Sequence, residues 1–219
     1  MPIASTQPKS YRLVIFDMDG TLTHELLDFP AIRREMGLPE KAGILEHMEA
    51  MPAEQRQRAE EILQRHEMIA AEHCRVHEGA AEVLAALHQA GIRTAVLTRN
   101  SSACAARILA RHRLAPEHVS TREDKPHKPH ADSILRITRR WHILPEQTLM
   151  VGDYLYDVQA AANAGTDSAL VCHKPGPVPE FAAQATYVVR SLREVLAIAT
   201  RSTGVPPVNV PHGRADEHG

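Results

Sequence analysis

The feature that most constrains this chain is a short apolar run that ends abruptly in two carboxylates. Residues 13–16 are Leu-Val-Ile-Phe, and this apolar, partly β-branched composition predicts a buried strand. Asp17 and Asp19 follow at once, and Gly20 permits a sharp bend at little steric cost. Ligands bind at the carboxyl ends of strands in open parallel sheets. Two acidic groups are costly to pack there unless a cation or a reaction uses them, so the stretch predicts a functional site.

Most of the remaining chain alternates between predicted strands and predicted helices. Further strands are predicted at residues 92–98, 118–121, 148–152, 168–171 and 187–189. Helices are predicted between and after them, at residues 79–89, 101–112, 131–141, 159–164 and 191–199. This alternation indicates an α/β fold, a Rossmann-like parallel sheet with helices on both faces.

One segment interrupts the alternation, because its apolar residues follow a helical period. It contains three predicted helices, at residues 30–36, 40–51 and 52–74. We therefore expect an inserted all-helical cap. The predicted division is a core domain of residues 1–23 and 77–200, a cap of residues 24–76 and a flexible C-terminal tail of residues 201–219, which is rich in proline and glycine.

Composition excludes several classes of protein. The 219 residues suffice for one core with room for an inserted module. A net charge of −2 gives no electrostatic reason to expect nucleic acid or membrane partners. The three cysteines are scattered and odd in number, which favours reduced thiols. The first ten residues lack the apolar core of a signal peptide, and we expect a cytoplasmic protein.

Two later strands also end in polar groups. Thr98 closes the strand at 92–98, and its hydroxyl, with the N–H groups that open the next helix, could bind a phosphoryl oxygen. Asp153 follows the strand at 148–152, and Asp157 lies one helical turn further on. Taken singly, each group could be a helix cap or a first-turn acid. That interpretation does not explain why several strand ends all carry groups suited to one reaction.

In the order in which they occur, these stretches resemble the motifs of the haloacid dehalogenase-like (HAD) superfamily. The first is Asp17-Met-Asp-Gly-Thr and the last is Gly152-Asp-x-x-x-Asp157. The resemblance extends to about residue 195. The small helical cap is similar to that of the phosphoglycolate phosphatase and β-phosphoglucomutase branch. Many members of that branch have Asp-Ser two residues after the Thr-Leu pair that is Thr21-Leu22 here, whereas this chain continues Thr23-His24-Glu25, so phosphoglycolate in particular is not implied.

The resemblance implies a role for each motif residue. Asp17 would be the nucleophile that forms an aspartyl-phosphate, and Asp19 would be the general acid and base. Thr98 would orient the phosphoryl group, and Arg99 and Asn100 beside it are candidates for substrate binding. Arg99 could contact an anionic substrate or be a surface residue. The true dehalogenases lack an acid at the position of Asp19, so its presence favours phosphoryl transfer.

The third motif is a lysine, usually before proline, that balances the charge of the nucleophile and the phosphoryl group. Two Lys-Pro pairs compete for this role, at Lys125 and Lys128. We choose Lys128, because it lies 25 residues before Asp153, a gap similar to that of the family. Lys125 is the alternative.

The resemblance also implies a Mg²⁺ site. The ligands would be the carboxylates of Asp17 and Asp153 and the main-chain carbonyl of Asp19. Asp157 would be an outer-shell acceptor or would point at Lys128. Mg²⁺ suits such a site because it is a hard cation that prefers oxygen ligands.

The expected function is a Mg²⁺-dependent phosphatase of a small phosphorylated metabolite. The alternative is a phosphomutase that acts on a sugar phosphate with the same residues. Another alternative is a binding or regulatory protein that has the fold of the enzymes without their activity. Such a protein is expected to lack one of the motif acids, and this chain has all of them. A zinc protein is a further alternative, because His73 and His77 are four residues apart on a possible helix, but no cysteine or acid joins them at ligand spacing. Candidate cap contacts to the substrate are Arg33, Arg34 and His47. The oligomeric state is left open.

Overall fold

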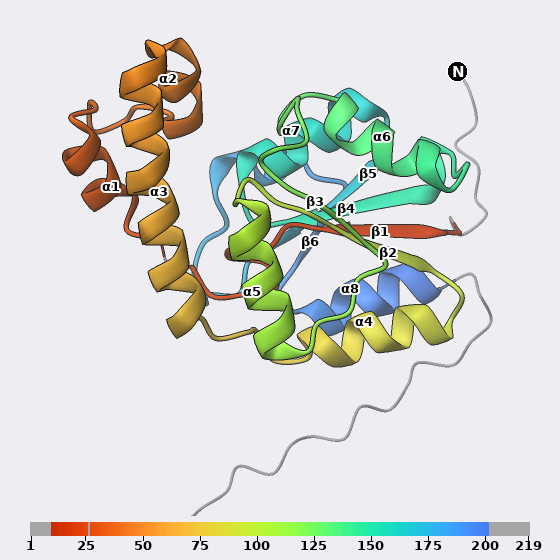
Figure 1. Cartoon of the computed structure of the whole chain (residues 1–219). Coiled ribbons are helices and arrows are strands. Elements are labelled where there is room, and N and C mark those ends of the chain that lie inside the picture. Colours follow the sequence, from red (N-terminus) through yellow and green to blue (C-terminus); the bar gives the residue numbers. More distant parts are fainter. Residues whose placement is uncertain (1–9, 26, 202–219) are drawn as a thin grey trace, which may run out of the picture.

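A computed structural model describes residues 10–25 and 27–201 of the chain. Within this part, six parallel strands form one sheet in the order β3-β2-β1-β4-β5-β6 (Figure 1). The strands are β1 (Leu13–Phe16), β2 (Arg93–Leu97), β3 (His118–Ser120), β4 (Thr148–Gly152), β5 (Asp167–Val171) and β6 (Tyr187–Val189). The predicted α/β fold is confirmed.

The order of the strands places the motif-bearing strand ends side by side. β1 lies between β2 and β4, and Phe16 pairs in register with Val96 of β2 and with Val151 of β4. The three strands therefore end at the same level. Any side chain that follows one of them lies at the same edge of the sheet as those that follow the other two.

Helices cover both faces of the sheet. One face carries α4 (Ala80–Gln89), α5 (Ser102–His112) and α8 (Leu192–Thr200), and the other carries α6 (Asp132–Arg140) and α7 (Leu155–Ala164) (Figure 1). The side chains of β1 alternate between these two layers, as the period of a strand requires. Val14 and Phe16 pack with the first set of helices, whereas Leu13 and Ile15 pack with the second. All four are fully buried, which explains why the run is apolar without interruption.

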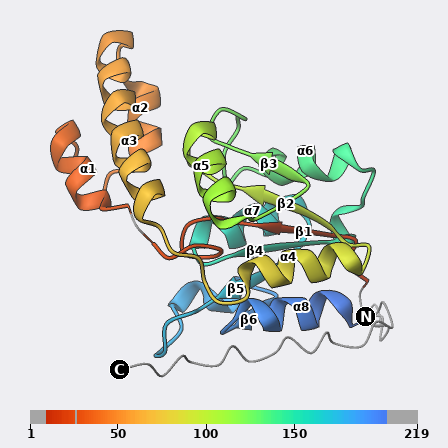
Figure 2. The same cartoon turned by 60° about the horizontal axis from the view of Figure 1, so that its bottom comes forward.

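Three helices between β1 and α4 form a separate group. They are α1 (Phe29–Met36), α2 (Ile44–Ala50) and α3 (Ala53–His73). Their apolar side chains make a cluster of their own: Ile32, Ile44, Leu45, Met48, Ala59 and Leu63. In Figures 1 and 2 the three helices lie together beyond the carboxyl ends of the strands, and the base of α3 is next to α5.

The second of these helices is shorter than predicted. The sequence predicts a helix from residue 40, whereas α2 begins at Ile44, after a turn. Gly43 precedes the helix with an extended backbone (φ −67°, ψ 119°). Glycine is a poor residue for a helix interior, because it loses the most backbone entropy when it is ordered there, so the helix begins after it.

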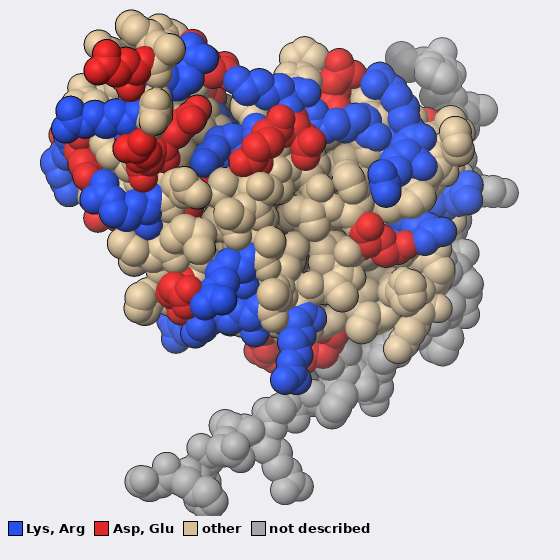
Figure 3. Space-filling model, in the orientation of Figure 1, with Lys and Arg blue, Asp and Glu red and all other residues tan. Residues whose placement is uncertain are grey.

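Other predictions about the ends and surface of the chain are tested only in part. Apart from Arg201, the predicted flexible tail lies outside the described residues, and the boundaries between core and cap stay a prediction. None of the helices in the described part combines the length and the apolar character that a bilayer span needs. On the face seen in Figure 3, basic and acidic side chains are interspersed over cap and core alike.

Candidate active site

A buried lysine joins two carboxylates where β1 and β4 end. The chain leaves β1 alongside β4, since the N–H of Asp17 donates to the carbonyl of Val151 at 2.8 Å. The ammonium group of Lys128 donates to Oδ1 of Asp17 and, at 2.7 Å, to Oδ1 of Asp157. Lys128 is only 4 % exposed. Burial lowers the pKa of Lys128, but Asp157 and Asp17 more than offset this effect, so its pKa lies above the ordinary value and the lysine stays charged.

Asp157 is held in place by the start of α7. Its Oδ2 accepts the N–H of Tyr154 at 3.1 Å, which leaves Oδ1 for Lys128. A Cβ at Gly152 would lie 2.2 Å from Cγ of Asp157. Only glycine at that position gives the carboxylate its space. The structure therefore favours the second of the two expected positions of Asp157, pointing at the lysine.

Asp153 lies against the loop that follows Asp17. The hydroxyl of Thr21 donates to Oδ1 of Asp153 at 3.2 Å. Gly20 has a φ of +81°, and a Cβ on it would lie 2.2 Å from Oδ2 of Asp153. Gly20 thus supplies both a left-handed backbone and a close approach that other residues cannot make. Burial, and then repulsion from Asp157, raises the pKa of Asp153 to about 7.

The carboxylates of Asp17, Asp153 and Asp157 offer oxygen atoms that all lie within 4.8 Å of one another. Among the described residues, no other group of three or more histidine, cysteine or acidic side chains has ligand atoms within this distance of one another. An all-oxygen set fits Mg²⁺. Burial is also the largest cause of the raised pKa of Asp17, opposed by Lys128 and reinforced by Asp157 and Asp153. A site in which burial and mutual repulsion penalise carboxylates suits a cation that would stabilise their charged form.

Asp19 accepts a hydrogen bond from a side-chain amide in the loop after β2. Asn100 donates from Nδ2 to Oδ2 of Asp19 at 2.6 Å. The N–H of Asn100 donates to Oγ1 of Thr98 at 3.1 Å, so the buried Thr98 and Asn100 form one unit. Burial raises the pKa of Asp19 to about 6, while the hydrogen bond from Asn100 and the charge of Lys128 oppose the rise. The second motif is therefore tied directly to Asp19.

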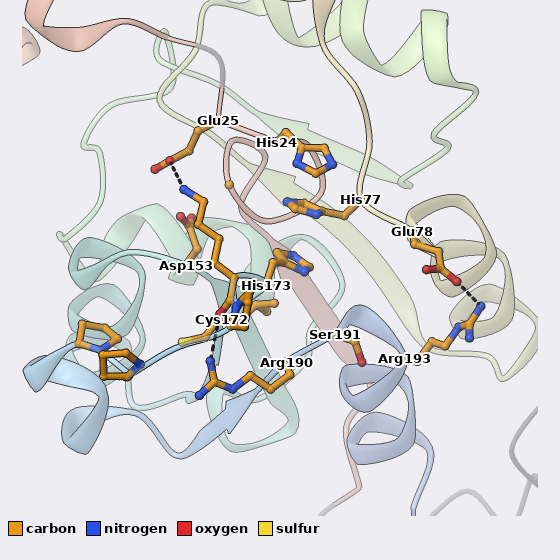
Figure 4. Close-up of a pocket in the computed structure, with 16 residues that line it drawn as sticks. His24, Glu25, His77, Glu78, Asp153, Cys172, His173, Arg190, Ser191 and Arg193 are labelled. Atoms are coloured by element: carbon orange, nitrogen blue, oxygen red, sulfur yellow. Dashed lines mark hydrogen bonds and ion pairs between the residues drawn. The ribbon is translucent and has the colours of Figure 1, made fainter. Parts of the chain in front are cut away.

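A cavity of about 650 Å³ opens beside Gly20 and Asp153. Figure 4 shows three histidines on one side of it, from both linkers of the cap and from the loop after β5. The ring of His77 lies between those of His24 and His173, with centroid distances of 3.9 Å and 3.5 Å. Burial, and then the neighbouring His173 and His24, lowers the pKa of His77 to about 4. His77, the central ring of the stack, is therefore uncharged near neutral pH.

Comparison with known proteins agrees with this geometry. The family model of haloacid dehalogenase-like hydrolases matches residues 11–165. The chain belongs to this family. It is 31 % identical over 172 residues to a haloacid dehalogenase-like hydrolase domain-containing protein of Arabidopsis thaliana, covering 73 % of this chain and 70 % of the relative. It is also 31 % identical over 197 residues to an N-acetylmuramic acid 6-phosphate phosphatase of Pseudomonas aeruginosa, covering 73 % and 81 %.

The fold of this HAD-like hydrolase is that of solved members of the superfamily. A HAD-superfamily hydrolase of subfamily IA, variant 1, from Geobacter sulfurreducens superposes with a TM-score of 0.61 at 22 % identity. The alignment covers 90 % of this chain and all of the other. The predicted family is confirmed by the family model and the curated relatives. Membership of the family, together with phosphatases among the relatives, supports a phosphoric monoester hydrolase.

The structure separates the two candidate lysines of this HAD-like hydrolase. Lys128 lies buried between Asp17 and Asp157, whereas the side chain of Lys125 is 62 % exposed and pairs with Glu49 of α2 at 2.6 Å. Lys125 is therefore placed as a contact between core and cap. Its role and that of Lys128 in catalysis stay predictions.

Arg99 contacts the cap. Its guanidinium pairs with Glu46 of α2 at 2.5 Å and lies over the ring of Tyr156, 5.1 Å from the centroid. Two of the candidate cap residues contact the backbone of the cap: Arg33 donates from Nε to the carbonyl of Ala42 at 2.8 Å, and the exposed His47 contacts the carbonyl of Gly43 at 2.9 Å. Those two contacts stay within the cap.

The geometry does not favour the zinc alternative. α3 ends at His73, so His77 does not share its helix. His73 contacts the carbonyl of Ile69, and His77 stacks on other rings.

Sequence reasoning missed the acidic residues of the cap that reach the core. Glu46, Glu49 and Glu67 each pair with a basic residue of the core. A signal for Glu67 existed: it lies four residues after Leu63 and four before Ala71, both buried. An acid on the apolar stripe of a helix indicates a buried partner.

Proposed function

We propose that this protein is a Mg²⁺-dependent phosphatase that hydrolyses a small phosphorylated metabolite through an aspartyl-phosphate on Asp17. The observation that carries the proposal is the buried cluster in which Lys128 lies between Asp17 and Asp157, with Asp153 beside them. A solvated acidic turn would not need a buried lysine. A nucleophilic carboxylate that must approach a phosphate dianion does need one, because like charges repel.

In the first step, a carboxylate oxygen of Asp17 bonds to phosphorus and the bond to the leaving oxygen breaks. The proton of Asp19 passes to that leaving oxygen, which departs as an alcohol. Burial raises the pKa of Asp19 to about 6, so Asp19 is protonated in a fraction of the molecules near neutral pH. The amide of Asn100 fixes the orientation of Asp19.

In the second step, Asp19 accepts a proton from water while the water oxygen bonds to phosphorus. The bond between Asp17 and phosphorus then breaks, which releases inorganic phosphate, restores the carboxylate of Asp17 and leaves Asp19 protonated, as it was before the first step. Lys128 carries positive charge beside Asp17 throughout and opposes the repulsion between the nucleophile and the phosphoryl oxygens. Thr98, Arg99 and Asn100 form the segment proposed to contact the substrate.

The carboxylates of Asp17 and Asp153 and the main-chain carbonyl of Asp19 would hold Mg²⁺. When bound, the cation would supply further positive charge to the phosphoryl oxygens. The helices of the cap would exclude bulk water and contribute to specificity. A cytoplasmic setting is part of the proposal, and the three cysteines, which are free thiols, support it.

Phosphate release tests the proposal. We expect the purified chain to release phosphate from some phosphorylated metabolites with Mg²⁺ and to stop when the metal is chelated. The panel includes sugar phosphates and N-acetylmuramic acid 6-phosphate, since a relative is named for that substrate. The Asp17→Asn variant should be inactive. Equal phosphate release by wild type and Asp17→Asn would show that Asp17 is not the nucleophile.

The second candidate is a phosphomutase. It uses the same residues but returns the phosphoryl group to a sugar. Phosphorus NMR of the products of a sugar monophosphate separates the two, because a mutase yields an isomeric sugar phosphate and a phosphatase yields inorganic phosphate.

A further inference from the structure

The cap helix α3 buries one carboxylate against the core. Glu67 is only 1 % exposed. Its neighbours along the helix face, Leu63 and Ala71, are also buried. A buried charge is costly unless it is paired and hydrogen-bonded. The contacts of Glu67 should therefore explain why a carboxylate is buried at this position.

Glu67 contacts two segments of the core. Its Oε2 accepts the hydroxyl of Ser101 at 2.6 Å and lies 3.4 Å from the N–H of the same residue. The guanidinium of Arg122 donates to both carboxylate oxygens of Glu67, from Nη1 to Oε1 and from Nη2 to Oε2 at 3.3 Å. Ser101 is the N-cap of α5, and Arg122 follows β3. The cap carboxylate thus joins the loops after β2 and β3.

Both of these segments are connected to Asn100. Ser101 is its neighbour in the chain, and the N–H of Arg122 donates to the carbonyl of Asn100 at 2.9 Å. Asn100 in turn donates to the carboxylate of Asp19 at 2.6 Å. The cap is therefore connected to Asp19 by hydrogen bonds through Arg122 and Asn100, and by Ser101 through its peptide bond to Asn100.

We propose that Glu67 is a positioning residue, which fixes Asn100 through Ser101 and Arg122 and so holds Asp19 in place for proton transfer. The inference rests on the proposed function. It gives the cap a role in the chemistry besides covering the site. Two other ion pairs between cap and core differ in kind: Glu46–Arg99 and Glu49–Lys125 involve half-exposed carboxylates, whose pairing contributes little.

The dependence of the rate on the leaving group tests this role. p-Nitrophenyl phosphate has a good leaving group that needs little help from an acid, whereas phenyl phosphate has a poorer one. A displaced Asp19 should therefore slow phenyl phosphate more. We expect Glu67→Gln to lower kcat/KM for phenyl phosphate about tenfold more than for p-nitrophenyl phosphate. A loosened cap alone would slow both substrates equally.

The chain offers a matched control on the same helix. Glu72 of α3 pairs with Arg107 of α5 at 2.7 Å, but both side chains are about half exposed and neither contacts Asn100. Glu72→Gln should leave the ratio of the two kcat/KM values unchanged. If Glu72→Gln changes the ratio as much as Glu67→Gln does, the effect does not depend on the contacts of Glu67 and the proposal is wrong.

A second variant keeps the test decisive if Glu67→Gln fails to fold, which circular dichroism would show. Ser101→Ala removes the hydroxyl that donates to Glu67 and leaves the pair with Arg122. It should change the same ratio about threefold. An unchanged ratio in the folded variants overturns the role of Glu67 even when Asp17→Asn abolishes activity. Activity that survives Asp17→Asn overturns the proposed function instead.

Discussion

The ammonium group of Lys128 lies 2.7 Å from a carboxylate oxygen of Asp157 and also donates to Asp17. Two carboxylates thus share one buried ammonium group. In an interior with low polarity, such a group costs more to desolvate than a surface pair and often contributes nothing to net stability. Its presence is better explained by a need for positive charge beside Asp17.

The first prediction concerns this lysine. Lys128→Ala should lower kcat by about 10²–10³-fold, because it removes the positive charge that faces the nucleophile. Lys125→Ala is the matched control in the same loop. It should change kcat by less than about twofold, since Lys125 and its partner Glu49 are both exposed. Steady-state kinetics on folded variants checks both, and the reverse pattern would make Lys125 the motif lysine.

The second prediction concerns the approach of Gly20 to Asp153. Gly20→Ala would place a Cβ 2.2 Å from a carboxylate oxygen of Asp153 and would also strain a backbone with φ +81°. We expect the Mg²⁺ concentration for half-maximal activity to rise by about tenfold or more, since the clash displaces a ligand.

Gly37→Ala separates the clash from backbone strain. Gly37 has a similar φ of +69°, but nothing lies within 4 Å of its added Cβ. This variant should lose about 1 kcal/mol of unfolding free energy and keep its Mg²⁺ dependence. Equal Mg²⁺ dependence in the two variants would contradict the prediction.

The sequence predicted those parts of the molecule that depend on local pattern. The apolar run before Asp17 and the run before Asp153 are strands for the expected reason, that both of their faces are buried. The parallel sheet followed from the alternation of elements. The two Lys-Pro pairs show what residue spacing can predict. The gap to Asp153 favoured Lys128, and in the structure Lys128 is buried whereas Lys125 is exposed.

The missed features depend on contacts between distant segments. Glu67 meets Ser101 across 34 residues and Arg122 across 55, and no local pattern encodes where α3 docks on the core. The pairing of Arg99 with Glu46 spans 53 residues. The stack of His24, His77 and His173 forms because both linkers of the cap meet the loop after β5.

The third prediction concerns Arg99, which directly follows Thr98 and is paired with Glu46 of the cap at 2.5 Å. An anionic group on a substrate would compete with Glu46 for this guanidinium. For a phosphomonoester that carries a carboxylate, Arg99→Gln should raise KM about fivefold and Glu46→Gln should lower it, with kcat unchanged, which corresponds to about 1 kcal/mol.

p-Nitrophenyl phosphate is the control substrate, because it has no second anionic group. Neither variant should change its KM more than about twofold. If both variants instead raise KM for both substrates together, Arg99 serves only to hold the cap and does not contact the substrate.

The fourth prediction concerns pH and the histidine stack. Burial, and then His173, His24 and Lys174, lowers the pKa of His77 from 6.5 to about 4. Between these two values the unfolded chain binds more protons at this position than the native chain does. The contribution of His77 to the free energy of unfolding should therefore fall as the pH falls from about 6.5 to about 4. Urea midpoints of the metal-free protein at about pH 7.5 and about pH 5 measure the change.

His77→Gln isolates this effect from other groups that titrate in the same range. Asp17, Asp19 and Asp153 act in the opposite direction, because their pKa values are raised and the native state then binds the extra protons. The variant keeps the contributions of these acids and loses that of His77, so its midpoint at about pH 5, relative to its midpoint at about pH 7.5, should be higher than that of the wild type. His88→Gln, which changes an exposed histidine outside the stack, should follow the wild type. A variant His77→Gln that also follows the wild type would mean that the stack does not resist protonation.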